Sequence, residues 1–142
     1  MPRHRVSTRS QSGFTLIEGL VAILVFSLAV LALVGLQTTA VQQSSNAKMR
    51  ANASLLASQI LGQMWVSDRT PATLQTNFQT GGANYNAWLA NVQASLPVPS
   101  TALPTVTVTN AGLVTVTVKW KAPNEPASDP PHQYVAVAQL NN

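Results

Sequence analysis

The chain has 142 residues, 46% of them hydrophobic and only 8% charged, with a formal net charge of +4. This length suggests one domain. Three of the eight basic residues, Arg3, Arg5 and Arg9, precede residue 14, so the rest of the chain carries five basic and four acidic side chains. This near balance argues against nucleic-acid binding, which needs a clustered basic face. With two histidines and no cysteine, we expect no disulfide, metal site or cofactor.

A short basic leader, residues 1–13, is followed by a long apolar segment. Between Gly19 and Leu36 there is no charged residue, and Ser27 is the only polar side chain. Together with residues 14–18, this segment reaches the roughly 20 residues that a helix needs to cross the hydrocarbon core of a membrane. Because the arginines precede the segment, the positive-inside rule places the N-terminus in the cytoplasm and the remainder across the membrane.

The apolar segment encloses one carboxylate, Glu18. A charge inside a membrane-spanning helix costs about 2.5–3.5 kcal/mol on insertion scales, so such a residue is a candidate functional group. An ordinary secretory signal also has a basic leader and an apolar stretch. Here, however, the apolar run continues through Gln37 into further helix-forming sequence, without a small-residue cleavage site and a following loop. The candidate processing site lies before the run, between Gly13 and Phe14.

The residues at this junction, 13–18, read GFTLIE. Placed between a basic leader and an apolar helix, they resemble the class III signal of type IV pilins. The resemblance implies that prepilin peptidase cleaves between Gly13 and Phe14 and that Phe14 becomes an N-methylated N-terminus. It also implies that Glu18 is the acidic residue of the family. The new amine and Glu18 would lie one helical turn apart, and pairing of this carboxylate with the amine of an adjacent subunit would set the register of assembly.

Within the family, residues 31–37 look more like the minor pilins of the PilV group than like major pilins. Major pilins often carry a proline where this chain has Gly35. The chain also departs from the family at Gly19, which replaces the usual valine after the glutamate. A glycine inside a helix costs about 1 kcal/mol relative to alanine, so this departure affects helix strength rather than the motif.

The helix is predicted to continue through an amphipathic half, residues 37–69, because no proline occurs between Phe14 and Thr70. Residues at spacings of three and four define one face of this half: Val41, Ser45, Met49, Ala53, Leu56, Ile60 and Met64. Pro71 disfavours helix at the preceding residue. A helix from Phe14 to Val66 would be roughly 80 Å long, so only its first part, residues 14–36, fits a bilayer.

Residues 70–142 are predicted to form a globular domain of mixed structure. Helical spacing from Tyr85 to Leu96 indicates a short helix that Pro97 ends. Alternating residues then indicate three strands, at 105–109, 114–120 and 133–140, with a glycine-containing turn at 110–112. The expected fold is α+β and pilin-like, with a small antiparallel sheet that packs its valines and Trp120 against the amphipathic half of the long helix.

Candidates for chemistry are few in this domain. Asp129 and His132 in the proline-rich loop 122–132 suggest a catalytic triad, but no nucleophile motif such as G-x-S-x-G accompanies them. We therefore interpret the segment as a solvated loop and expect no enzymatic activity. The aromatic side chains are expected to belong to the core rather than to a ligand site: Tyr85, Trp88, Trp120 and Tyr134.

The resemblance implies a minor pilin, a structural subunit held in the bacterial inner membrane with its C-terminal domain in the periplasm. Its expected partners are prepilin peptidase, the major pilin, other minor pilins and an inner-membrane assembly platform. It would then enter a type IV pilus or its priming complex, a fibre of the kind used in adhesion and twitching motility. Two alternatives stay open: a minor pseudopilin of type II secretion, and an unrelated single-span membrane protein with a periplasmic binding domain and an uncleaved N-terminus.

Overall fold

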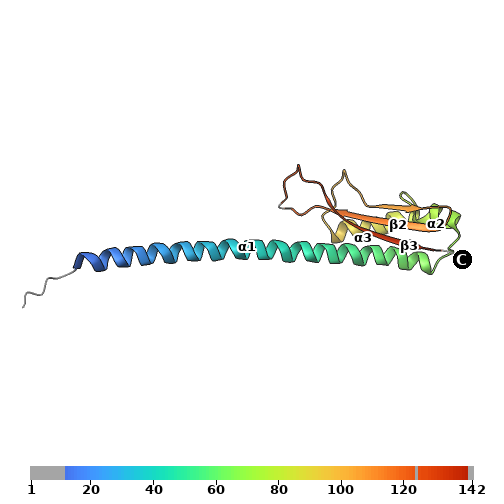
Figure 1. The fold of residues 1–142 in the computed structure, drawn as a ribbon. Helices are drawn as coiled ribbons and strands as arrows, with labels where there is room; N and C mark the ends of the chain where they lie inside the picture. The colour runs from blue at the N-terminus through green and yellow to red at the C-terminus, as the bar shows by residue number, and fades with distance from the viewer. Residues whose placement is uncertain (1–11, 124, 141–142) are drawn as a thin grey trace, which may run out of the picture. The chain divides into compact units, whose positions relative to one another are not determined.

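The computed structural model describes residues 12–123 and 125–140, with side chains from Phe14 onward. Most of the predicted leader, including its three arginines and His4, therefore lies outside the described residues. The elements follow one another as α1 (Ser12–Trp65), α2 (Pro71–Phe78), α3 (Ala83–Ser95), β1 (Thr105–Val108), β2 (Leu113–Trp120) and β3 (His132–Gln139) (Figure 1). The chain divides into two compact units, one ending at Gln43 and one beginning at Ser44.

The long helix α1 comprises 54 residues, in close agreement with the predicted helix from Phe14 to Val66. Its C-terminal end is closed by Ser67, whose backbone N–H and hydroxyl both donate to the carbonyl oxygen of Met64, at 3.3 and 2.9 Å. These bonds satisfy a carbonyl that has no partner inside the helix. The helix thus ends before Pro71 is reached, and a short connection leads into α2.

In the second unit, α1 buries one stripe against the rest of the fold: Met49, Ala53, Leu56, Ala57, Ile60 and Met64. The predicted stripe is confirmed from Met49 onward. Its two earlier members are exposed, so the prediction was wrong at Val41 and Ser45. Val41 belongs to the first unit, whose described residues form only this helix, and helical spacing alone does not supply a surface to pack against.

Helix α2 was not predicted. Pro71 occupies its first turn, where the missing N–H costs nothing, and Leu74 and Phe78 are its buried residues. The turn into α3 depends on two glycines. Gly81 has a φ of 97°, in the left-handed region that favours glycine, and a Cβ at Gly82 would collide with the backbone carbonyl of Asn77.

Helix α3 confirms the predicted short helix and buries Tyr85, Trp88 and Val92. It ends where the backbone N–H of Leu96 bonds to the carbonyl of Val92 at 2.9 Å, just before Pro97.

The sheet is antiparallel, as predicted, and its strand order is β1-β2-β3. Val106 pairs with Val116, and Val116 pairs with Ala136. The valines of β1 and the even-numbered residues of β2 are buried, while the intervening threonines are not. This alternation gives the sheet one buried face and one wet face. Residues of β3 on the wet face include Val135 and Val137, which are 46% and 60% exposed.

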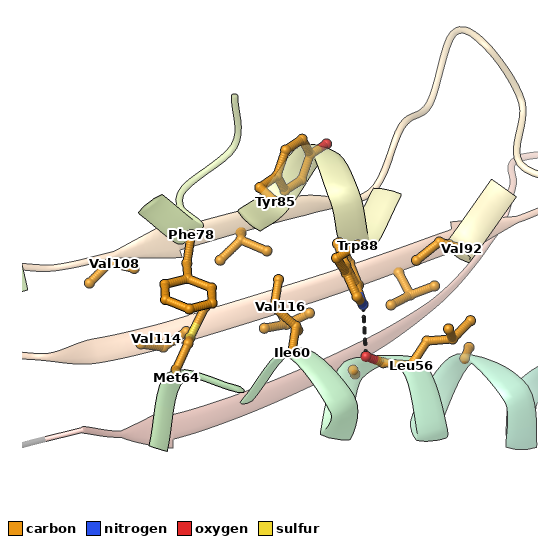
Figure 2. Packing of buried hydrophobic residues seen from close by; sticks show 14 of the residues in the cluster. Leu56, Ile60, Met64, Phe78, Tyr85, Trp88, Val92, Val108, Val114 and Val116 are labelled. Atoms are coloured by element: carbon orange, nitrogen blue, oxygen red, sulfur yellow. Dashed lines mark hydrogen bonds between the residues drawn. The ribbon is translucent and has the colours of Figure 1, made fainter. Parts of the chain in front are cut away.

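The core of the second unit lies between the α1 stripe, the two short helices and the buried face of the sheet (Figure 2). Two of its aromatic residues with polar groups, Trp88 and Tyr85, have hydrogen-bond partners in other segments. The Trp88 indole N–H donates to the carbonyl of Leu56 at 2.8 Å, and the Tyr85 hydroxyl donates to the carbonyl of Pro104 at 2.6 Å. Such partners let an aromatic side chain be buried without an unsatisfied donor. The predicted core positions of Tyr85, Trp88 and Trp120 are confirmed, and Tyr134 packs against the core half-buried.

Candidate functional site

The first turns of α1 carry the residues that the sequence singles out. The helix begins at Ser12, so Gly13, Phe14 and Glu18 all have helical backbone. Phe14 and Glu18 are four residues apart, which places them on one face of the helix with a rise of about 6 Å between them. Phe14 is 70% exposed, and Glu18 is exposed.

Glu18 is electrostatically isolated. It makes no hydrogen bond or ion pair with any residue that the structure describes, and no other charged residue follows it before Lys48. The carboxylate therefore enters an apolar environment without a counter-charge from its own helix. Taking a lone carboxylate out of water is costly unless a cation accompanies it, so this group requires a partner that the described residues do not supply.

The surface around Glu18 is apolar on all sides of the helix. None of the most hydrophobic window of α1 is buried, and among the described residues α1 is the one helix long and apolar enough to cross a membrane by length and composition. The large exposed apolar side chains from Phe14 to Leu36 are Phe14, Leu16, Ile17, Leu20, Val21, Ile23, Leu24, Val25, Phe26, Leu28, Val30, Leu31, Leu33, Val34 and Leu36. A continuous apolar surface of this kind indicates contact with a membrane or with other protein chains.

Hydroxyl groups in this half of α1 bond to the helix itself. The Ser27 hydroxyl donates to the carbonyl of Ile23 at 2.7 Å, and the hydroxyls of Thr38 and Thr39 each donate to a carbonyl four residues earlier, at 3.1 and 3.2 Å. Back-bonding of this type satisfies a hydroxyl without a partner from outside. Sequence reasoning noted Ser27 as polar but did not anticipate this bond. Because Ser27 is satisfied in this way, Glu18 is the polar group of the 14–36 segment that most needs an external partner.

The glycines of this half are not required by packing within the chain. A Cβ at Gly19 or at Gly35 would meet no atom within 4 Å. Small residues on an apolar helix allow another helix to approach closely. Both positions therefore leave room for another helix to approach this half of α1.

The proline-rich loop does not assemble the suggested triad. His132 Nε2 lies 2.6 Å from Glu125 Oε1 rather than beside Asp129. The Asp129 carboxylate accepts a hydrogen bond from the neighbouring Ser128 hydroxyl, at 3.4 Å. Within the described ranges, no serine hydroxyl bonds to His132, and no group of three or more histidine, cysteine or acidic residues could hold a metal ion.

Bonds within the loop instead hold its two ends together. The Lys121 ammonium donates to the carbonyls of Ala127 and Asp129, at 3.0 and 2.8 Å. The hydrogen bond from His132 holds the pKa of Glu125 below its ordinary range, against a smaller opposing effect of desolvation and with help from the Ala122 N–H. These contacts are structural, and they shape the end of the loop where β3 begins.

Comparisons with known proteins agree with the site at the start of α1. Residues 8–34 match the family model described as the prokaryotic N-terminal methylation motif. The chain is also 34% identical over 91 residues to the type II secretion system protein I of Klebsiella pneumoniae, an alignment that covers 63% of this chain and 75% of that protein. No solved structure matches the chain significantly.

Proposed function

The chain belongs to the family of pilins and pilin-like proteins that carry the N-terminal methylation motif, and we propose that it is a non-enzymatic minor subunit of a bacterial envelope fibre. The observation that carries this proposal is the GFTLIE sequence at residues 13–18, inside the matched segment 8–34 and at the start of a helix with an exposed apolar surface. The subunit is anchored in the inner membrane by this helix. Its second unit is placed in the periplasm by the arginines of the leader.

Maturation creates the cation that Glu18 lacks. Cleavage by prepilin peptidase between Gly13 and Phe14 leaves an amine on Phe14, which is then methylated and stays protonated. In the membrane this amine lies one turn from the carboxylate of the same chain. In the fibre the amine of an adjacent subunit takes its place. Because a buried charge without a partner costs several kcal/mol, pairing of Glu18 with that amine favours one axial register over others.

Of the two machines that use such subunits, the type II secretion system is favoured by the Klebsiella pneumoniae relative. In this reading the chain is a minor pseudopilin, and it assembles with a major pseudopilin and other minor ones on an inner-membrane platform. A minor pilin of a type IV pilus is the second candidate. It is supported by residues 31–37, which resemble the PilV group and carry Gly35 in place of the proline of major pilins.

Two experiments in the native host test the two levels of the proposal. Intact mass of the purified protein is expected to show a chain that begins at a methylated Phe14. A mature chain that retains Arg9 would contradict the proposal and favour an unrelated single-span membrane protein. Deletion of the gene separates the machines: lost protein secretion with normal twitching supports the pseudopilin, and lost twitching with normal secretion supports the type IV pilus.

A further inference from the structure

A concave site of about 210 Å³ lies in the second unit, where α1 meets the adjoining ends of β2 and β3. Its wall is formed by Asn46, Ala47, Arg50, Trp120, His132 and Gln133. We propose that this pocket, called here the Arg50 pocket, binds the carboxylate of an acidic side chain from a neighbouring subunit of the fibre. The source of the carboxylate rests on the proposed function, whereas the binding chemistry rests on the pocket alone.

The charge of the Arg50 pocket is not balanced within the chain. Arg50 is exposed and makes no ion pair or hydrogen bond with any described residue, and no acidic side chain is part of the wall. The acidic residue closest to this wall by bonding, Glu125, already pairs with His132 at 2.6 Å. The pocket therefore presents one uncompensated guanidinium, whose planar pair of donors matches a carboxylate.

A second donor of the wall is also unused. Trp120 is only 4% exposed, and its indole N–H makes no hydrogen bond with any residue that the structure describes. Among the described residues no buried side-chain nitrogen or oxygen lacks a partner, so this N–H reaches solvent. Trp88 differs, because its N–H is bonded to Leu56. The Trp120 ring thus belongs to the core and also lines the pocket, while its N–H remains a donor that no described residue uses.

The wall around this donor is held in place before any ligand arrives. The ring of His132 stacks on Trp120, with centroids 5.8 Å apart and planes inclined by 24°, and its Nε2 is fixed by Glu125. The side-chain amides of Asn46 and Gln133 line the same hollow and can each donate further hydrogen bonds to an oxygen. Preorganised donors lower the entropic cost of binding, because fewer side chains have to be ordered when the ligand arrives.

The charge of the pocket favours a protein carboxylate over a lipid headgroup. Recognition of anionic lipids relies on clusters of several lysines and arginines, whereas this wall has one cationic side chain besides a histidine that already has a partner. One guanidinium balances one carboxylate. In an assembled fibre, the chains that reach this surface are the neighbouring subunits, so an aspartate or glutamate of such a subunit is the proposed occupant.

The binding chemistry is tested with the full-length protein in detergent, using sodium acetate as the probe at constant ionic strength. The NMR signal of the Trp120 indole N–H is expected to shift saturably, while that of Trp88 stays fixed. Arg50→Gln is expected to weaken the response by about tenfold, and Lys48→Gln, which removes a cation of the same helix outside the pocket, is expected to leave it unchanged. Equal titrations of the wild type and Arg50→Gln would overturn the proposal, as would a response to inorganic phosphate with none to acetate.

The partner is tested in cells by comparing Arg50→Glu with Lys48→Glu, which make the same change of charge. Both variants are expected to be processed to Phe14, but only Arg50→Glu should be recovered with other fibre subunits at about a tenth of the wild-type amount. Wild-type recovery of Arg50→Glu would exclude a neighbouring subunit as the source of the carboxylate. If instead the wild-type protein is not cleaved at Phe14, the proposed function fails, and the acetate titration still decides whether the pocket binds carboxylates.

Discussion

At the scale of single residues, the polar groups of buried aromatic side chains specify how the core is arranged. Trp88 and Tyr85 come from the same helix, with ring centroids 5.9 Å apart, and each donates to a carbonyl of a different segment. These bonds fix the rings in rotation as well as in depth, which apolar contact alone does not do. The sequence identified both residues as core, but their partners Leu56 and Pro104 are backbone carbonyls that no side-chain pattern reveals.

Trp88→Phe is expected to reduce the free energy of unfolding by about 1–3 kcal/mol, because it removes the buried hydrogen bond that the indole N–H donates to the Leu56 carbonyl and also removes ring volume. Urea unfolding of the full-length protein in detergent, followed by circular dichroism, measures the change. The matched control is Trp65→Phe at a ring that is 48% exposed, where a change within about 0.5 kcal/mol is expected. Equal losses for both variants would place Trp88 outside the core.

The pair of Glu125 and His132 predicts how stability responds to acid. A carboxyl whose pKa is lower in the folded chain stabilises the fold above its ordinary pKa of about 4.3, and this contribution is lost as the pH falls through the lowered value. The pKa of Glu125 is lowered mainly by the hydrogen bond from His132. Glu125→Gln is therefore expected to be less stable than the wild type at about pH 6, where the carboxyl of Glu125 is ionised. The two proteins are expected to be equally stable well below about pH 4, where that carboxyl is protonated in both the folded and the unfolded chain.

Thermal unfolding over this pH range measures the difference. Asp68 also has a lowered pKa, owing first to the hydrogen bond from the Thr70 N–H, so Asp68→Asn is the control for a carboxylate elsewhere in the fold. A difference between Glu125→Gln and the wild type that is independent of pH would show that the ion pair contributes nothing.

At the scale of elements, the periodicity of apolar residues predicted the helices and strands whose pattern is regular. The long helix, α3 and the three strands were recognised because each repeats its apolar positions several times at a spacing of one kind. Helix α2 was missed because its eight residues bury only Leu74 and Phe78, and because Pro71 was interpreted as a stop signal although proline equally begins a helix. The stripe on α1 was predicted too far toward the N-terminus, since Val41 fits the helical spacing without having a surface to pack against.

The two candidate sites also differ in how far the sequence alone could predict them. The cleavage and assembly residues form a contiguous motif, so sequence alone proposed them. The Arg50 pocket brings together residues that are far apart in the chain, Arg50, Trp120 and His132, and only the fold places them in one wall. The sequence offered Trp120 as a core residue, which is correct for its ring but does not reveal its open N–H.

The contribution of α2 to the second unit is tested by Leu74→Ala, because Leu74 is fully buried. A loss of about 2–5 kcal/mol in the free energy of unfolding is expected from the lost burial and the cavity that remains. Leu55→Ala makes the same chemical change on α1 at a side chain that is 69% exposed, and there the stability should change little. A small effect at Leu74 would mean that α2 is not part of the cooperative fold.

At the scale of the whole molecule, the two units differ in whether their apolar side chains are buried or exposed. Every residue of the described hydrophobic core lies between Met49 and Leu140, within the second unit, whereas the first unit exposes its apolar side chains. A truncated protein that begins at Ser44 is therefore expected to be a soluble monomer with native helix and sheet content, while the full-length protein needs detergent. Analytical ultracentrifugation and circular dichroism test this, and aggregation of the truncated form at micromolar concentration would contradict it.

The proposed function makes assembly depend on Glu18, a charge that the fold of the second unit does not use, so Glu18→Val is expected to separate assembly from folding. Removing the carboxylate from the apolar segment should make membrane insertion easier, since the cost of about 2.5–3.5 kcal/mol disappears. Cleavage should continue, because it depends mainly on Gly13. Incorporation into fibres should fall, since the amine of an adjacent subunit loses its anion, and breaking such a buried pair costs about 3–5 kcal/mol.

Three amounts in the native host distinguish these effects: the membrane level of the variant, its processed mass and its content in sheared fibres or, for a pseudopilin, in the assembled complex. Gly13→Val is the matched control, because it keeps Glu18 but should leave the precursor uncut in the membrane. Normal incorporation of Glu18→Val at a normal membrane level would show that Glu18 does not set the register. A subunit at the tip of a fibre has no subunit beyond it, so it uses one side of the pairing, and a defect milder than that of the same change in a major subunit would indicate that position.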